Sequence, residues 1–430
     1  MRVLFVAKEL RMEPLGIMYL ASALKDAGHA VELARCDGVG CGPEKAIQHF
    51  QPDVLAYSVC TGSEQFYFDL NDRLQQLGRF RAIFGGSAPT FSPGLFKGRD
   101  YIRGEAEIAL VAWVEGREVR HLQLADVEAV ADPDRALVYQ FSDSRLDPIK
   151  NIITRRGCTG GCSYCFNRQW NNLHRGQHPP GIVRYRSVDH VVTEAMCIAR
   201  NWPLRMINFV DDNFASSIAW LREFVSKWPH IPFFCSLDAR DGTEEAIRLL
   251  AQAGGTVINL SLETANDETR TKVLRRHVSK TAVYQAIKRI HRHGMRTRLQ
   301  NIIGLPVNNP LADAYQTLAF NIRCAPTSSW CSILQAFSGS LINKIAHARH
   351  MAPADNSVDS GFFGTSTLHI SNRRQIERLH KLWPLLTRFP GLARFAPILI
   401  RLPLPFQLYK WLFNVTKQYF CERELWRVFR

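Results

Sequence analysis

The sequence predicts an α/β protein in three parts, and three observations support this. Strand-length apolar segments alternate with helical patterns through the first third of the chain. The same alternation restarts after a stretch that carries prolines and acidic residues, and it disappears toward the C-terminus. We expect a doubly wound, Rossmann-like domain at 1–140, a linker at 141–151, a (β/α)6-type partial TIM barrel at 152–345 and a small, mostly helical domain at 346–430.

The first domain is expected to begin with a buried strand and to continue as helix and strand in turn. The strands are expected at 2–7, 30–36, 53–59, 80–86 and the start of 101–116. The helices are expected at 15–29, 46–50, 64–77 and the end of 101–116. Strands separated by helices form a parallel sheet with helices on both faces, and such sheets bind ligands at the carboxyl ends of their strands.

The second domain shows the same pattern. Its strands are expected at 152–157, 206–214, 232–240, 256–264, 296–306 and 330–337. Helical patterns lie between them, for example at 244–254 and 280–294. Six such units suit a barrel or a partial barrel, which carries its chemistry at the carboxyl ends of the strands.

The segment "RRGCTGGCSYCF" (155–166) places Cys158, Cys162 and Cys165 directly after a predicted strand. Glycines between the first two cysteines remove Cβ atoms where the backbone must curl around a bulky inorganic group. Three thiolates satisfy three irons of a 4Fe–4S cluster, whose usual protein complement is four cysteines. The next cysteine is Cys197, so one iron would stay open to a small molecule.

Two other interpretations of the three cysteines remain open at this point. A zinc ion would need a fourth ligand, for which His174 is a candidate. Zinc sites more often use paired C-x2-C units, and only one is present here. Three packing thiols would leave the glycines unexplained. The spacing therefore favours an iron–sulfur cluster.

The C-x3-C-x2-C motif, with Tyr164 before its last cysteine and at the end of the first barrel strand, closely resembles the radical S-adenosylmethionine (SAM) superfamily. The resemblance covers about residues 150–345. It implies that the amino and carboxylate groups of SAM chelate the open iron, and that an electron from the cluster cleaves SAM to a 5′-deoxyadenosyl radical. It also implies an electron donor such as flavodoxin or ferredoxin.

The same resemblance places SAM contacts at the later strand ends. "VDDNF" (210–214) corresponds to the second strand, although the usual Gly-Gly-Glu is absent. "SLDAR" (236–240), "LSLETANDETRTKVLRR" (260–276) and "QNIIGLP" (300–306) correspond to the next three. The implied SAM-binding residues are Tyr164, Asp211, Asp212, Ser236, Asp238, Arg240, Glu263, Gln300, Ile303 and Gly304. A single acidic residue can equally be a helix cap, but recurrence at consecutive strand ends favours a functional role.

Placed ahead of such a barrel, the first domain resembles the cobalamin-binding domain of the cobalamin-dependent radical SAM group. The matching segments are "PLGIMYLASALKDAGHAVEL" (14–33), "PDVLAYSVCTGSE" (52–64), "IFGGSAPTFSP" (83–93) and "YIRGEAE" (101–107). Small residues at strand ends let backbone and hydroxyl groups approach a large flat macrocycle. The implied cobalamin-binding residues are Leu15, Gly16, Ser58, Thr61, Gly62, Gly85, Gly86, Ser87, Gly104 and Glu105.

The Asp-x-His-x-x-Gly signature, which places a histidine on cobalt in some cobalamin proteins, is missing from this domain. His29 follows "DAG" and reads as a helix-end residue, so we expect no protein histidine on cobalt. The alternative is a flavin or nucleotide domain. That alternative is weakened because no G-x-G-x-x-G follows the first strand.

The formal net charge is +15, and residues 371–430 hold 12 Lys or Arg against three Glu. In this tail the basic residues alternate with Leu, Ile, Pro and aromatic residues. That pattern favours a helical domain with a solvated basic face, leaves peripheral membrane contact open and disfavours nucleic acid. Eleven cysteines, an odd count, without a signal sequence or a spanning stretch, indicate a cytoplasmic protein.

The function expected from these features is methyl transfer from SAM, via methylcobalamin, to an unactivated carbon or phosphinate centre of a small-molecule or natural-product substrate. The same cofactors could instead serve a cyclisation or rearrangement without net methylation. An iron–sulfur or zinc protein that binds RNA through the basic tail is a further alternative. Strand-end SAM contacts count against that last reading.

Overall fold

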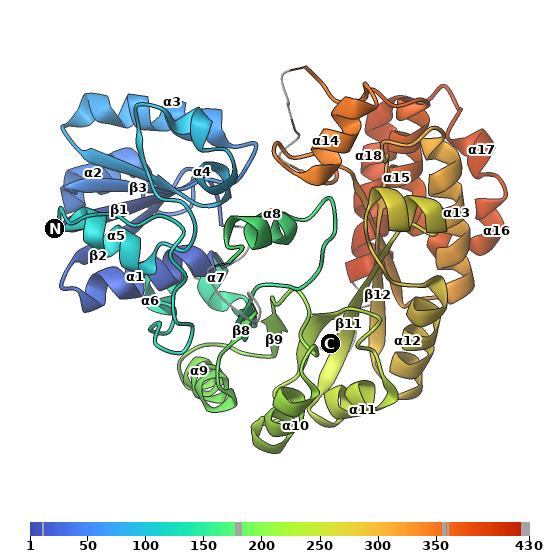
Figure 1. Ribbon diagram of the computed structural model, residues 1–430, viewed down its shortest axis with the longest axis horizontal. Helices are drawn as coiled ribbons and strands as arrows, with labels where there is room; N and C mark the ends of the chain where they lie inside the picture. The colour runs from blue at the N-terminus through green and yellow to red at the C-terminus, as the bar shows by residue number, and fades with distance from the viewer. Residues whose placement is uncertain (11–12, 177–182, 355–357, 359–360, 423–430) are drawn as a thin grey trace. The chain divides into compact units, whose positions relative to one another are not determined.

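The computed structural model describes residues 1–10, 13–176, 183–354, 358 and 361–422. It divides into two compact units, Met1–Asn151 with Asn171–Leu204 and Ile152–Trp170 with Arg205–Arg430. Both units have the α/β architecture that the sequence predicts (Figure 1). Each is described separately below.

The first unit is built on a five-stranded parallel sheet in the order β2-β1-β3-β4-β5. Its strands are β1 (Arg2–Ala7), β2 (Ala30–Arg35), β3 (Val54–Ser58), β4 (Arg81–Gly85) and β5 (Asp100–Tyr101). Its helices are α1 (Leu15–Asp26), α2 (Pro43–Phe50), α3 (Glu64–Leu74), η1 (Gln75–Leu77), α4 (Ser87–Phe91), η2 (Pro93–Phe96), α5 (Glu107–Val114), α6 (Arg135–Tyr139), α7 (Ser142–Leu146) and α9 (Val188–Asn201). The expected doubly wound domain is confirmed.

The core lies on both faces of this sheet. Along β1, Val3 and Phe5 pack into one buried cluster, whereas Leu4 and Val6 pack into another. Successive strand residues point to opposite faces, so burial on both faces requires helices on both sides. The strand order reverses between β1 and β3, and the carboxyl ends of these strands are where open α/β sheets bind their ligands.

A buried ion-pair network attaches residues 171–204 to the first unit. Arg135 on α6 donates to Glu194 of α9 at 2.5 Å, and Arg186 donates to the other oxygen of the same carboxylate at 2.5 Å. All three side chains are nearly fully buried. We expected residues 171–204 in the barrel domain, and periodicity alone could not place them with the first unit. The residues expected to form a linker contain α7 and the start of β6.

The second unit is built on a six-stranded sheet in the order β13-β12-β11-β10-β9-β6. Its strands are β6 (Ile149–Ile152), β9 (Met206–Phe209), β10 (Phe233–Leu237), β11 (Gly255–Glu263), β12 (Arg296–Ile303) and β13 (Ser328–Ile333). The pairings from β9 to β13 are parallel. Helical segments connect them, namely α10 (Ile218–Lys227), α11 (Glu244–Gln252), η3 (Thr269–Val273), α12 (Lys280–Arg292), α13 (Pro310–Cys324) and α14 (Leu341–Ala348). The expected partial barrel is confirmed.

The first barrel strand is shorter than the sequence predicted. We expected one strand at 152–157, but β6 ends at Ile152, and only the short β7 (Arg155–Arg156) follows before α8 (Phe166–Leu173). The break has a local cause, because the amides of Thr154 and Arg155 donate to the Asp211 carboxylate at 2.9 and 3.0 Å. The short β8 (Arg184–Tyr185) completes the strands of the chain described here.

Each barrel strand presents alternate residues to the covering helices and to the inner face of the sheet. On β12, Asn301 bonds Asn321 of α13 at 3.0 Å, which turns it toward the helices. Gln300 accepts a hydrogen bond from Ser261 of β11 at 3.0 Å on the inner face. By the same alternation Arg298 belongs to the inner face, and it lies over the Trp330 ring of β13 at 4.9 Å.

The C-terminal residues are helical as predicted and belong to the second unit. They form α15 (Arg373–Arg388), α16 (Pro390–Ala393), α17 (Ala396–Leu399), α18 (Phe406–Thr416) and η4 (Lys417–Glu422). Helix α15 covers β13, where Trp383 donates to the Ser329 hydroxyl at 2.8 Å. Residues 423–430 of the expected domain lie outside the described part. Among the helices described, none has the length and apolar character needed to cross a bilayer.

Candidate active site

The three-cysteine loop folds tightly in the second unit at the carboxyl end of its first strand. Gly157 precedes Cys158 and has a φ of +92°, a conformation that disfavours any side chain. A Cβ at Gly160 would lie 3.2 Å from the Cys158 sulfur. The glycines therefore allow the backbone to turn close to the sulfurs, as the sequence predicted.

Each of the three sulfurs receives an N–H donor from the surrounding protein. The Gly160 amide donates to Cys158 at 3.3 Å. The Asn167 side chain donates to Cys165 at 3.6 Å, and the Arg276 guanidinium donates to Cys162 at 3.8 Å. Packing thiols have little need for three separate donors, whereas thiolate ligands of an iron–sulfur cluster are tuned by such bonds. The donor set thus fits a 4Fe–4S cluster held by these cysteines.

The single-ion alternative finds less support in the geometry. In the described ranges, no group of three or more His, Cys, Asp and Glu side chains converges on one metal ion. His174, the candidate fourth zinc ligand, is buried in the first unit, where its Nε2 lies 3.1 Å from the Leu122 carbonyl oxygen. Burial raises the pKa of the free Cys165 thiol to about 12, so a bound metal must displace its proton.

The two aspartates after β9 have different roles. Asp211 is buried, and its oxygens accept bonds from the Thr154 and Arg155 amides and from the Thr154 hydroxyl at 2.9–3.0 Å. Its carboxylate is thus occupied within the protein. Asp212 is exposed to solvent. It lies near the cysteines, because its negative charge adds to the burial of the Cys158 and Cys165 thiols in raising their pKa. Of the pair, Asp212 has the more accessible carboxylate, although Asn167 also bonds it, and the SAM contact implied for it stays a prediction.

Tyr164 and Glu263, which lie 99 positions apart in the chain, meet in the second unit. The Tyr164 hydroxyl donates to Glu263 at 2.8 Å. Glu263 ends β11 at a register shift and has a φ of +72°, which is strained for a residue with a side chain. Burial raises the pKa of this carboxyl. Strained residues at strand ends concentrate at functional sites, which supports the predicted role of this pair.

Arg276 links these groups. It is the last residue of the segment 260–276 that resembles a radical SAM strand and helix, but no role was predicted for its side chain. It donates to the Ser261 carbonyl at 2.8 and 3.1 Å and to the Cys162 sulfur at 3.8 Å. It also pairs with Asp238 at 3.6 Å. Neighbouring carboxylates and the Tyr164 hydroxyl raise the pKa of Arg276 despite the cost of burial, so it is a permanent cation. Its place in the second arginine of "VLRR" was the available signal.

Asp238 and Arg240 remain together at the end of β10. Arg240 donates to Asp238 at 3.0 and 3.1 Å, while the Asn213 side chain accepts a bond from the Asp238 amide at 3.0 Å. Burial alone would raise the pKa of Asp238, but Arg240 and Arg276 outweigh it and lower the pKa. Ser236 on the same strand is half-buried, and its carbonyl accepts a bond from the Phe214 amide.

The β12 motif separates into inward and outward residues. Gln300 lies on the inner face beside Ser261. Ile303 is fully buried, and Gly304 after it has a φ of +74°. A Cβ at Gly304 would meet Ile370 at 3.5 Å, so this position favours glycine through its backbone conformation more than through crowding. The SAM contacts implied for these three residues stay predictions.

The inner face also carries an arginine that has no ion-pair partner in the described chain. Arg298 stands in register with Asn259 of β11, and the Arg298 Nε and the Asn259 Oδ1 are both buried without a hydrogen bond there. Burial lowers the pKa of Arg298. Glu422, whose charge acts on Arg298, is itself paired with Lys417 at 3.2 Å. Sequence reasoning did not single out this polar pair.

The cobalamin candidates of the first unit gather at the carboxyl ends of β3 and β4. The Thr61 amide donates to the Ser87 hydroxyl at 3.2 Å, which ties the two strand ends together. A Cβ at Gly86 would approach the Val59 carbonyl oxygen to 2.7 Å, so only glycine fits. Gly62 has a φ of +90°. Ser58 and Gly85 end their strands as paired residues of the sheet.

The remaining cobalamin candidates are more dispersed. Leu15 and Gly16 begin α1, and Gly16 has open space around it. Gly104 has a φ of +87° beside Leu122. Glu105 forms an ion pair with Arg184 and accepts a bond from the Ala125 amide, which favours a structural role for its carboxylate. The cobalamin roles of these ten residues stay predictions.

His29 lies where the sequence placed it, at the end of a helix. Its Nδ1 is 3.2 Å from the N-terminal amine of Met1, and its Nε2 is 3.7 Å from Glu115. This is the amino edge of the sheet, whereas ligands bind at the carboxyl edge.

Comparison with protein families finds two matches. The model described as the B12 binding domain matches residues 1–114, and the model described as the Radical SAM superfamily matches residues 152–318. Both fall on the domains whose motifs suggested them, and in the expected order. Among proteins of curated function, none matches the sequence.

Two kinds of solved structure share the fold. The radical S-adenosylmethionine methyltransferase TsrM from Kitasatospora setae, with tryptophan substrate and a SAM analog bound, is 17% identical over 81% of this chain and 76% of its own, with a TM-score of 0.65. The cobalamin-dependent S-adenosylmethionine radical enzyme OxsB, with aqua-cobalamin bound, is 15% identical over 99% and 71%, with a TM-score of 0.71. Another TsrM structure holds cobalamin and a [4Fe-4S] cluster.

Substitution of Asp212 by asparagine should weaken SAM binding to the reconstituted protein by about tenfold or more, because it removes a charge-assisted hydrogen bond to the SAM amine. Asp211→Asn should retain most of the affinity, since both Asp211 oxygens are engaged within the protein. Anaerobic titration calorimetry on variants of equal iron content measures both. Equal loss in the two variants, or loss only in Asp211→Asn, would reverse the assignment.

Asp211 should make stability depend on pH. Burial raises its pKa to about 6 in the folded protein, above the value of about 3.9 expected for an unfolded chain. The folded state therefore binds the proton more tightly, and stability from this group is lost as pH rises from about 4 to about 6, by roughly 3 kcal/mol. Urea unfolding of the apoprotein across this range, compared with Asp211→Asn, isolates the effect. A constant difference between the two proteins would show that Asp211 titrates normally.

Proposed function

Because a B12 binding domain precedes a radical SAM domain in this chain, we propose that it is a cobalamin-dependent radical SAM methyltransferase. It would move a methyl group from SAM, by way of cobalamin, to an unactivated carbon or a phosphinate centre of a small-molecule or natural-product substrate. A protein of the same fold, TsrM, is a methyltransferase that takes tryptophan, which supports methyl transfer as the reaction class. The substrate of this chain is a separate question, since the identity is only 17%.

The observation that carries the proposal is the environment of the three cysteines. Each sulfur has its own N–H donor, and an exposed carboxylate, Asp212, lies beside two of them. Such a loop suits a cluster with one iron left for SAM. The B12 binding domain ahead of it supplies the second cofactor that radical methylation of an unreactive carbon requires.

When bound, the cluster supplies the electron that cleaves SAM, and cobalamin carries the methyl group. The protein's own residues bind and orient. Cys158, Cys162 and Cys165 would hold the cluster, and Asp212 would hold the SAM amine. The Tyr164–Glu263 pair, which lies close to the Arg276 cation, would position the rest of SAM. Gly62 and Gly86 would let the backbone of the first unit approach the macrocycle.

A cyclisation or rearrangement with the same cofactors is the second candidate, and product mass separates the two. Methylation adds one CH2 to the substrate, whereas rearrangement leaves its mass unchanged or loses hydrogen. The reaction also needs a one-electron reductant of the flavodoxin or ferredoxin class. Both the reductant and the substrate class belong to the proposal.

The proposed chemistry is tested on anaerobically purified protein reconstituted with iron, sulfide and hydroxocobalamin, then reduced in the presence of SAM. We expect 5′-deoxyadenosine by mass spectrometry and about one cobalamin per chain by its absorption spectrum. Cys158→Ala should abolish the 5′-deoxyadenosine, because the cluster loses a ligand. Competent preparations that bind neither cluster nor cobalamin would refute the proposal.

Two polar side chains on the inner face of the barrel support a proposal about the class of substrate. Arg298 is a half-buried cation without an ion pair in the described residues, its Nε is buried without a hydrogen bond there, and the Asn259 Oδ1 of the neighbouring strand has no donor. Leaving such groups unpaired is costly, so a ligand that completes them gains the missing interactions. We therefore propose that Arg298 anchors a carboxylate or phosphate of the substrate, and that Asn259 accepts a hydrogen bond from an adjacent donor group.

Matched pairs of candidate substrates, each acid beside its neutral amide, test this anchor. We expect a product heavier by one CH2 from the acids alone. Arg298→Gln should raise KM for the productive acid by about tenfold or more and should lower kcat less, because the anchor acts mainly in binding. Arg222→Gln, at an exposed arginine of α10, is the control. Equal turnover of acid and amide, or a KM that Arg298→Gln leaves unchanged, would remove Arg298 from the substrate site.

A further inference from the structure

Exposed large apolar side chains concentrate near the C-terminus. Nine of the sixteen found in the described residues lie between residues 389 and 419. They form two rows, which we call the tail rows. The first row is Phe389, Leu392, Phe395 and Ile398, and the second is Leu404, Leu408, Trp411, Val415 and Tyr419. Single exposed apolar residues are ordinary, but a concentration of this kind marks an interaction surface.

The second tail row is a stripe along α18 and into η4. Leu408, Trp411 and Val415 follow one another at spacings of three and four residues, so they lie on one side of the helix. Another side of α18 is already buried, where Tyr409 and Phe413 pack in the unit. One apolar side of α18 therefore packs in the core of the unit, and a second apolar side is exposed to solvent, with Trp411 60% exposed.

The first tail row runs along the short helices α16 and α17 and the residues that precede each of them, with one member every three residues. Ile398 is 62% exposed. The two rows meet at one end, because the Phe389 ring contacts the Phe420 ring with centroids 5.4 Å apart, and Phe420 follows Tyr419. The rows therefore belong to one connected part of the surface.

The charge around the tail rows has a single sign. Between Glu377 and Glu422 the sequence contains no acidic residue, but it contains seven basic ones: Arg378, Lys381, Arg388, Arg394, Arg401, Lys410 and Lys417. Of these, Arg388, Arg394, Arg401 and Lys410 are exposed. An apolar surface bordered mainly by cations is complementary to an anionic surface with an apolar layer beneath it.

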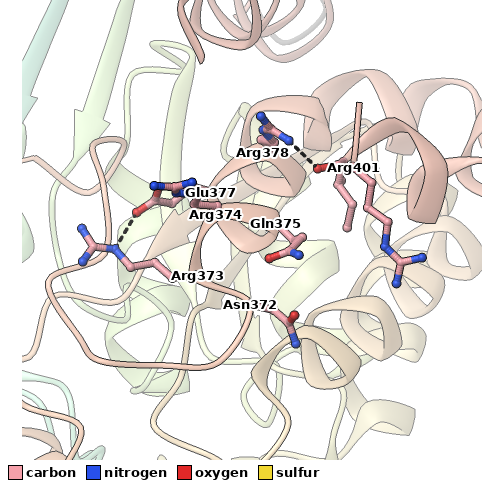
Figure 2. Close-up of a pocket in the computed structure, with 8 residues that line it drawn as sticks. Asn372, Arg373, Arg374, Gln375, Glu377, Arg378 and Arg401 are labelled. Carbon is pink, nitrogen blue, oxygen red and sulfur yellow. Dashed lines mark hydrogen bonds and ion pairs between the residues drawn. The ribbon is translucent and has the colours of Figure 1, made fainter. Parts of the chain in front are cut away.

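A basic hollow of about 740 Å³ opens between the start of α15 and the residues that follow α17 (Figure 2). It is lined by residues at the start of α15 and by Ile400 and Arg401. Arg373 is turned to Glu377 at 3.1 Å, and Arg378 donates to the Ile400 carbonyl at 3.1 Å. Arg374 and Arg401 form no ion pair with the described residues and are exposed. Two free guanidinium groups can bind a phosphate.

We propose that the C-terminal segment of the second unit docks on a membrane that contains anionic lipid. The tail rows enter the boundary between headgroups and acyl chains, and Arg374 and Arg401 bind a lipid phosphate. Trp411 and Tyr419 suit that boundary, because their rings are apolar at one end and polar at the other. A protein partner or a second copy would need its own acidic surface opposite this one, and this chain, at +15, has no excess of acid to offer.

The test is sedimentation of the full-length holoenzyme with two kinds of vesicle, phosphatidylcholine alone and phosphatidylcholine mixed with phosphatidylglycerol. We expect binding to the mixed vesicles that weakens as salt is added. A double variant, Phe395→Ser with Ile398→Ser, should weaken this binding by about tenfold or more, since two inserted apolar side chains are lost. Arg374→Gln with Arg401→Gln should reduce the preference for anionic vesicles by several-fold.

Matched controls remove exposed apolar side chains elsewhere. Leu95→Ser and Leu146→Ser, 57% and 63% exposed, should bind vesicles as the parent protein does. Thermal unfolding of every variant shows that each is folded. A protein that stays in the supernatant with both vesicle types would refute the proposal. So would size-exclusion chromatography that shows a dimer broken by the Phe395→Ser and Ile398→Ser changes, because the tail rows would then cover a second copy.

Discussion

The buried guanidinium of Arg276 holds the candidate active site together. It bonds a cysteine of the cluster loop, the backbone of β11 and the carboxylate at the end of β10. Its positive charge also stabilises the ionised form of Glu263, a buried acid beside Tyr164, against the cost of burial. Without this cation, Glu263 would lose its counter-charge in a poorly solvated site, whereas Asp238 would keep Arg240. The end of β11 can therefore carry an acidic group close to the cysteines because a permanent cation lies beside it.

The sequence was enough to predict the two α/β units, because their strands and helices have clear periodicity. It also identified the three cysteines and their glycines, whose spacing follows from local geometry. Arg276 could not be predicted, since its partners lie 15 to 114 positions away and only the fold brings them together. The same holds for the choice between Asp211 and Asp212. The two residues are adjacent in the chain, but only Asp211 receives hydrogen bonds from Thr154 and Arg155, which follow the first barrel strand.

Buried ion pairs, and not the order of elements in the sequence, assign residues 171–204 to the first unit. Their helix follows the cysteine loop in the chain, so position alone suggests the barrel. Glu194, however, is buried between Arg135 and Arg186. A buried carboxylate needs oppositely charged partners to offset its loss of hydration, and the two arginines supply them. The two units thus each have their own core and their own carboxyl edge. The cysteine loop and the B12 candidates belong to different units, and each site can form on its own scaffold.

The three N–H···S hydrogen bonds affect the reduction potential that a bound cluster would have. With a cluster bound, each bond would withdraw electron density from a thiolate ligand, and an added electron on the cluster would be easier to accommodate. One of the donors, Arg276, adds a full positive charge to that effect. The site should therefore accept an electron at a less negative potential than the same loop would without them. A cell could then drive the enzyme with a milder reductant, and less of its strongest reducing power would be spent on each turnover.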